Sequence, residues 1–271
     1  MTDLHLDERS IAINDDAGFA GMRAAGRLAA EVLDMLVPQV KPGVQTLTLD
    51  RLAYDYVIEH GGVSATIFYR GYSHALCTSI NHVICHGIPN DKPLQNGDIL
   101  NIDVTVVVDG WHGDTSRMYL VGDVPLKARR LVDLTYEALM LGIEQAKPGN
   151  TVGDIGAAIL AHAQKNRLAV VQDFCGHGLG RRFHMAPNIV HAGRAGEGPE
   201  LRPGMFFTIE PMLNLGRADA KILSDGWTAV TRDRSLSAQF EHSLGITESG
   251  CEIFTLSPAG FHRPPYCSGA A

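Results

Sequence analysis

Features typical of secreted, membrane-bound and nucleic-acid-binding proteins are missing from this sequence of 271 residues. The five cysteines are scattered and never spaced as CxxC, which argues against disulfides and a structural zinc site and favours reduced thiols. No apolar run is long enough to span a bilayer, and the polar, acidic N-terminus does not resemble a signal peptide. Lys and Arg form no run that could contact phosphates, and the net charge is −7. We therefore expect a cytoplasmic protein that binds neither membranes nor nucleic acid.

The composition is that of an ordinary globular protein, with 45% hydrophobic and 20% charged residues. Helical spacing of apolar residues predicts four helices, and short strands with glycine-rich loops follow the last of them. The expected helices cover about 16–37, 48–59, 125–146 and 152–165. Asn14, Asp15 or Asp16 can cap the first helix, and Pro38 ends it. We expect the tail 257–271 to be loosely attached. Without an oligomerisation signal, a monomer is the default expectation.

The most informative stretch is a predicted hairpin in which Asp109-Gly110 separates two β-prone runs. If these two residues form the turn, Asp114 lies opposite Thr105, and Asp103 lies two residues further along on the same face. Diagonal neighbours of this kind lie roughly 7–8 Å apart at Cα. Two like charges on a partly buried strand face are costly unless a cation neutralises them. A divalent metal is the simplest such cation.

A repeat divides the chain into two similar parts. Lys41-Pro42-Gly43 returns as Lys147-Pro148-Gly149, and Leu94-x-x-Gly97-x5-Asp103 returns as Leu201-x-x-Gly204-x5-Glu210. His86-x-x-Pro89 likewise has a counterpart in His184-x-x-Pro187. Coincidence is the alternative explanation, because KPG is a plain helix-ending turn, but three matches in the same order argue against it.

The repeat predicts two pseudo-symmetric halves, about 14–124 and 125–256, within a single catalytic domain 1–271 that has short tails. Two copies related by a pseudo-twofold axis would form a single antiparallel sheet covered by helices, with a cleft between the halves. Asp103 and Glu210 would then lie at equivalent places beside the cleft.

Four carboxylates and one imidazole interrupt strand-like or glycine-rich segments: Asp103, Asp114, His177, Glu210 and Glu241. Singly, each acid could lie on a solvated strand face, and the glycine-flanked His177 could be an ordinary loop residue. Together they match what two hard-to-borderline divalent cations require. A closed zinc site would need fewer carboxylates and more His or Cys. The donor set therefore favours a hydrolytic two-metal site.

These residues and their spacing resemble the methionine aminopeptidases, in the bacterial short form of type I. The resemblance rests on the eleven-residue step from Asp103 to Asp114 and on the motifs GHGLG at 176–180, TIEP at 208–211 and SAQFEH at 237–242. It also includes MRAAGR at 22–27 and CTSIN at 77–81. The resemblance implies the α+β "pita-bread" fold, which agrees with the two-half interpretation.

The resemblance also implies roles for the metal-binding residues. Asp103 would bind one metal through both oxygens, His177 and Glu210 would bind the other, and Asp114 and Glu241 would bridge them. Co²⁺, Mn²⁺, Fe²⁺ and Zn²⁺ are all candidates. A bridging water would attack the carbonyl carbon after the first residue, with Glu210 as proton shuttle.

His86 and His184 match the two non-ligand histidines of the family. The resemblance places His86 near the scissile nitrogen or leaving amine and His184 near the carbonyl oxygen. A pocket for the methionine side chain would be lined by Tyr69, Tyr72, Cys77, Phe183 and Trp227, where plain core packing is the alternative. One departure is Met185-Ala186, where the family often has Glu after the histidine.

The implied activity is removal of the initiator methionine from nascent chains with a small second residue, together with transient ribosome association. Two other functions remain open at this point. A proline-specific aminopeptidase or dipeptidase shares the fold but usually carries a large N-terminal domain. A non-catalytic binding protein on the same scaffold would have lost metal ligands, and all five are present here.

Overall fold

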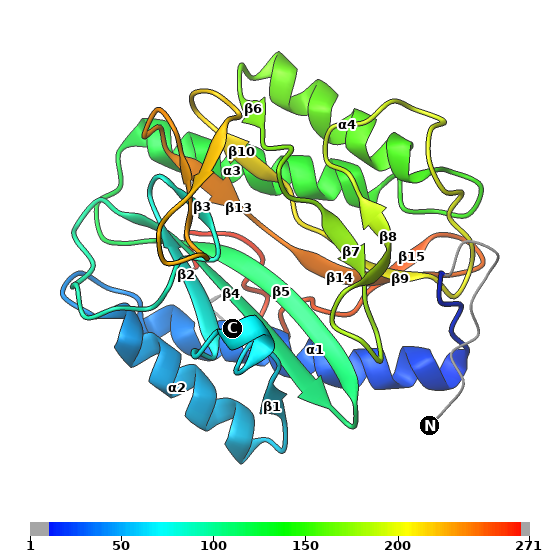
Figure 1. The fold of residues 1–271 in the computed structure, drawn as a ribbon, viewed down its shortest axis with the longest axis horizontal. Helices are drawn as coiled ribbons and strands as arrows, with labels where there is room; N and C mark the ends of the chain where they lie inside the picture. Colours follow the sequence, from blue (N-terminus) through cyan, green and yellow to red (C-terminus); the bar gives the residue numbers. More distant parts are fainter. Residues whose placement is uncertain (1–10, 267–271) are drawn as a thin grey trace.

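A computed structural model describes residues 11–266, in which two pairs of helices enclose a layer of antiparallel strands (Figure 1). α1 (Asp16–Leu36) and α2 (Thr46–Glu59) cover one part of the strands, and α3 (Leu126–Ile143) and α4 (Val152–Lys165) cover the other. The four predicted helices are confirmed, with boundary differences of up to three residues. No helix in the described part of the chain is long and apolar enough to cross a membrane.

Most strands are short, and two short 3-10 helices complete the regular structure. The 3-10 helices are η1 (Val37–Gln39) and η2 (Tyr69–Gly71). The strands are β1 (Val63–Ser64), β2 (Leu76–Ile80), β3 (Val83–Cys85), β4 (Ile99–Val108), β5 (Trp111–Leu120), β6 (Ala169–Val170), β7 (Gly176–Gly178), β8 (Met185–Ile189), β9 (Phe206–Ile209), β10 (Met212–Asn214), β11 (Ala220–Ile222), β12 (Ala229–Thr231), β13 (Ser237–Gln239), β14 (His242–Ile246) and β15 (Cys251–Ile253).

The long hairpin β4–β5 has the predicted register. Asp109 and Gly110 form its turn with φ of 48° and 79°, the left-handed conformations that a tight two-residue hairpin needs. Thr105 lies opposite Asp114, as the turn position predicts. Asp103 pairs with Ser116, so both carboxylates lie on one face of the ribbon.

All strand pairs in the described residues are antiparallel, as the fold prediction requires, but their ladders form four sheets rather than the single sheet expected. One sheet contains β1, β2, β4 and β5, and another contains β7, β8, β9, β14 and β15. A bridge between Ser116 and Glu241 connects these two sheets. Glu210 and Pro211 separate β9 from β10 along the chain. The hydrogen-bonded strand pairing is interrupted there because proline has no N–H to donate.

The helices pack closely because α1 presents small side chains to the hairpin. Ala25 and Ala29 are fully buried, and a Cβ built on Gly113 of β5 would lie 2.3 Å from the Ala25 carbonyl carbon. Any side chain at position 113 would therefore push α1 away from β5. This contact fixes the hairpin, and with it the strand face that carries Asp103 and Asp114.

The two KPG turns make equivalent contacts. The Gly43 N–H donates to the Leu94 carbonyl at 2.8 Å, and the Gly149 N–H donates to the Leu201 carbonyl at 3.1 Å. Both glycines have positive φ, 90° and 84°. The two turns therefore make the same contact at matching points of the sequence repeat.

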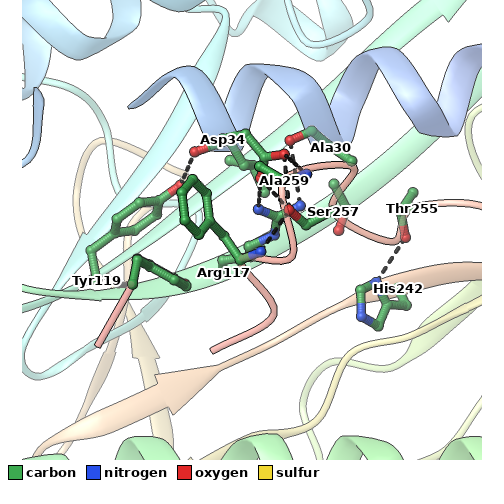
Figure 2. Close-up of polar contacts among 12 residues, drawn as sticks. Ala30, Asp34, Arg117, Tyr119, His242, Thr255, Ser257 and Ala259 are labelled. Atoms are coloured by element: carbon green, nitrogen blue, oxygen red, sulfur yellow. Dashed lines mark hydrogen bonds and ion pairs between the residues drawn. The ribbon is translucent and has the colours of Figure 1, made fainter. Parts of the chain in front are cut away.

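The prediction of a loosely attached tail is wrong for the described part, which ends at Tyr266. The Ser257 hydroxyl donates to both Asp34 oxygens at 2.8 and 2.9 Å, and the Tyr266 hydroxyl donates to the Met118 carbonyl at 2.6 Å (Figure 2 shows the Ser257 contact). The segment is held by groups far away in the sequence, which its own residues do not reveal. The rest of the predicted tail lies outside the described residues.

Candidate active site

One cavity of about 500 Å³ collects every residue that the sequence predicted for the site. The predicted metal ligands that line it are Asp103, Asp114, His177, Glu210 and Glu241. The predicted catalytic and substrate-binding residues that line it are Tyr69, Tyr72, Cys77, His86, Phe183, His184 and Trp227. Residues from early and late parts of the chain therefore line one cavity.

The candidate ligands come from separate segments of the central strands. Asp103 lies on β4, Asp114 on β5 and His177 in β7. Glu210 directly follows β9, and Glu241 directly precedes β14. Only the fold brings these five positions together.

Distances between their side chains suit a shared cation. His177 Nε2 lies 3.6 Å from Asp114 Oδ2 and 3.7 Å from Glu210 Oε1. Asp114, His177 and Glu241 each offer an atom within 4.8 Å of the others. His177 Nδ1 lies 3.1 Å from the Gly178 carbonyl, so Nδ1–H donates there and Nε2 is left to face the carboxylates.

The carboxylates of the site repel one another and are largely buried from solvent. Burial, reinforced by repulsion from Asp114 and Glu210, holds the pKa of Asp103 and of Glu241 well above the usual range. Burial also raises the pKa of Glu210 to about 7, although His177 opposes this shift. Oxygen donors of this kind, joined by one imidazole, fit divalent cations, which would remove the repulsion.

Hydroxyl and amide groups that the sequence analysis missed hold these carboxylates. Thr105 Oγ1 donates to Asp114 Oδ1 at 2.8 Å, and Thr208 Oγ1 donates to Glu210 Oε1 at 2.8 Å. Gln239 Nε2 donates to Glu210 Oε2 at 3.3 Å. Thr105 could have been found from the hairpin register, since it lies opposite Asp114, and Thr208 from its position two residues before Glu210 on one strand face.

Aromatic rings line part of the cavity. Tyr69 lies 5.0 Å from Phe183 and 5.2 Å from His184 between ring centroids. Tyr72 lies 5.0 Å from Trp227 in an edge-to-face arrangement. Such rings offer favourable contacts to a thioether side chain. Further lining residues that the sequence analysis did not single out for the pocket are Arg70, Asp173, Phe174, Cys175, Asn188 and Met212.

Two histidines and a thiol that line the cavity near these rings are uncharged at neutral pH. Burial lowers the pKa of His86 and lowers that of His184 to about 4, in the second case with repulsion from His177. Burial raises the pKa of the Cys77 thiol, with Asp103 adding to the effect, so the thiol stays protonated. A neutral imidazole can both donate and accept a hydrogen bond, whereas a protonated thiol is a weak nucleophile.

Comparison with known proteins identifies the family. The model of metallopeptidase family M24 matches residues 20–248. A methionine aminopeptidase of Rickettsia prowazekii is 56% identical over 259 residues, which cover 95% of this chain and all of that protein. A methionine aminopeptidase of Escherichia coli K12 is 50% identical over 91% of this chain and 94% of its own length. The chain belongs to the methionine aminopeptidases of metallopeptidase family M24.

Solved structures agree with this methionine aminopeptidase assignment. The crystal structure of the Rickettsia prowazekii enzyme superposes with a TM-score of 0.90 at 55% identity and covers 91% of this chain and all of that chain. The prolidase of Pyrococcus furiosus gives a TM-score of 0.73 at 20% identity, and the match covers 90% of this chain and 65% of that one. The prolidase likeness shows the shared fold alone. The predicted family and the pita-bread fold are confirmed.

Proposed function

We propose that this methionine aminopeptidase removes the initiator methionine from nascent polypeptides whose second residue is small. The observation that carries the proposal is a cavity whose lining combines a cation-binding donor set with a group of aromatic rings. The donor set suits cations that act on a backbone amide, and the aromatic rings suit the first side chain of the peptide. A proline-specific activity has only the fold in its favour.

Two divalent cations would be held by Asp103, Asp114, His177, Glu210 and Glu241. The cations supply Lewis acidity, which polarises a carbonyl and promotes the ionisation of water. Co²⁺, Mn²⁺, Fe²⁺ and Zn²⁺ all suit such a donor set. A non-catalytic binding protein would have no use for these ligands.

Glu210 would transfer the proton that hydrolysis must move from water to the departing amine. Its carboxylate is fixed by Thr208 and Gln239, so its oxygens keep one orientation during the transfer. His86 would donate to or accept from the scissile nitrogen, and His184 would donate to the carbonyl oxygen as negative charge develops there. Both rings are neutral at pH 7, which leaves each with one donor and one acceptor nitrogen.

The rest of the proposal concerns the protein as a whole. We expect it to act in the cytoplasm as a monomeric single catalytic domain, with residues 14–124 and 125–256 as its two halves, and to associate transiently with ribosomes as chains emerge. Tyr69, Tyr72, Cys77, Phe183 and Trp227 would select methionine by the size and polarisability of its side chain.

The test is hydrolysis of Met-Ala-Ser by chelator-treated protein to which each of the four metals is returned separately, with an Xaa-Pro peptide as competitor substrate. Glu241→Gln should lose more than the about 10–100-fold in metal affinity that outer-shell changes cost, and activity with it. Glu252→Gln is the matched control, because Glu252 pairs with Arg23 at the surface. Preference for the Xaa-Pro peptide would overturn the substrate assignment.

The role of His184 has its own test. His184→Ala should lower kcat far more than it lowers the amount of bound metal, because the ring is proposed to touch substrate and not the cations. Equal losses of metal and of activity would place His184 among the ligands instead.

A further inference from the structure

One histidine next to the candidate metal site was not singled out from the sequence and has no role in the proposed mechanism. His191 follows β8 and is only 2% exposed. Its Nε2 lies 3.1 Å from the backbone nitrogen of Glu210 and accepts that N–H. A backbone N–H can only donate, so Nε2 carries no proton and the ring proton is on Nδ1.

The backbone of Glu210 needs such an acceptor because it lies outside the ladder. Pairing between β9 and β14 ends with Ile209 opposite His242. Pro211 follows Glu210 and offers no N–H. A buried N–H without a partner is destabilising by about 1–3 kcal/mol. The His191 side chain thus provides the hydrogen-bond acceptor that a backbone carbonyl of a neighbouring strand provides within the sheet.

The arrangement leaves one buried donor of His191 unpaired. His191 Nδ1 is buried and has no hydrogen-bond partner in the described part of the chain. An apolar residue would avoid that unpaired donor but would leave the Glu210 N–H without an acceptor, so stability alone gives little reason to prefer histidine here. Buried polar groups that break the rule of full pairing are concentrated at functional sites. The histidine sits on the backbone of a candidate metal ligand whose carboxylate is held by Thr208 and Gln239.

We propose that His191 is a positioning residue that fixes the peptide plane at Glu210 and thereby the direction in which the Glu210 carboxylate projects toward the cations. The inference rests on the proposed function, in which Glu210 is a ligand. Thr208 and Gln239 hold the far end of the side chain, and His191 holds the end at which it leaves the backbone. Removing the acceptor lets the 209–210 peptide rotate, which displaces the carboxylate without changing any ligand.

Three substitutions separate this role from simple packing. In His191→Gln, the side-chain amide reaches the position of Nε2. In His191→Asn, the shorter side chain reaches only the position of Nδ1. His191→Leu removes the acceptor but also removes the unpaired Nδ1–H, so the protein should fold with nearly unchanged stability. Ile159→Val, a buried α4 change in the same core, is the control for general loosening.

The measurements are the dissociation constant of Mn²⁺ or Co²⁺ by calorimetry and unfolding in urea, with turnover of Met-Ala-Ser alongside. His191→Asn and His191→Leu should weaken metal binding about 10–100-fold, the range typical of residues that orient ligands. His191→Gln should stay within about threefold of the unchanged protein, and Ile159→Val should lower stability alone. Equal weakening in the Gln and Asn variants, or unchanged metal affinity in the Leu variant, would overturn the role.

Glu210→Gln distinguishes a failure of this inference from a failure of the proposed function. If Glu210→Gln weakens metal binding and His191→Leu does not, His191 is not a positioning residue although the ligand set stands. If Glu210→Gln leaves metal affinity unchanged, Glu210 is not a ligand and both proposals fall.

Discussion

Breaking one buried ion pair behind the active-site hairpin should strongly destabilise the protein. Arg117 on β5 is 1% exposed, and its guanidinium pairs with Asp34 of α1 (Figure 2). Asp34 also accepts from the Ser257 hydroxyl and from the Ala259 N–H, which ties the C-terminal segment to the same carboxylate. Asp34→Ala removes the partner of a charge that has no access to water.

The expected magnitude follows from burial. Leaving one member of a buried pair uncompensated costs about 3–5 kcal/mol. For a chain of this size each kcal/mol lowers Tm by about 2–4 °C, which gives a fall of about 6–20 °C. Asp55→Ala is the matched control, because Asp55 pairs with Arg51 on α2 with side chains 45% and 75% exposed. Exposed pairs contribute about 0.2–1 kcal/mol, so the control should lose at most a few degrees.

The assay is urea and thermal unfolding of both variants at neutral pH, followed by Asp34→Leu combined with Arg117→Met. An apolar pair of similar volume should recover much of the loss, because the isolated charge is gone. Turnover of Met-Ala-Ser, measured below the transition, should change little, since Arg117 does not line the cavity. A loss in Asp34→Ala no greater than that in Asp55→Ala would refute the reasoning.

Three further predictions concern metal, pH and substrate. Metal at 100 times its Kd should stabilise the folded protein by about 2.7 kcal/mol, and chelation or Asp114→Asn should abolish that gain in a thermal scan. Burial lowers the pKa of His242 from 6.5 to about 3, so its contribution to stability is complete above pH 6.5 and falls by about 1.4 kcal/mol per pH unit below it. His242→Gln should therefore show a shallower loss of stability in urea between pH 6.5 and 5, and equal slopes would contradict the assignment. Trp227→Ala should raise KM for Met-Ala-Ser about 2- to 12-fold through lost ring contacts, and an unchanged KM would remove Trp227 from the substrate pocket.

Local rules explain the parts of the fold that could be predicted from sequence. Asp109 and Gly110 specify a two-residue turn, and that turn determines every pair in β4–β5, including Thr105 opposite Asp114. Asp15 caps α1 through a hydrogen bond to the Gly18 N–H, one of the three candidates that the sequence offered. The five candidate ligands were found because each acid or imidazole interrupts a strand-like or glycine-rich segment that can be recognised in the sequence.

Long-range polar pairing explains what could not be predicted. Glu210 and His191 are 19 residues apart, and Arg117 and Asp34 are 83 apart. No periodicity links such residues, because each pair meets only after separate elements have packed. The same holds for the tail, where Ser257 looks like an ordinary polar residue until Asp34 is placed beside it.

The two faces of β5 carry side chains of opposite charge, and this links the site to the stability of the fold. Asp114 projects into the cavity, where its charge adds to the burial that holds the pKa of Asp103 well above the usual range. Arg117, three residues on, projects toward α1, and Tyr119 beside it donates to the Leu33 carbonyl at 2.7 Å. Because side chains alternate along a strand, the contacts that secure β5 to α1 also set the direction of Asp114. The acids that would bind the cations repel one another, and β5 is held in place against this repulsion by its contacts with α1. Loosening these contacts should weaken metal binding only when it also lets the hairpin shift.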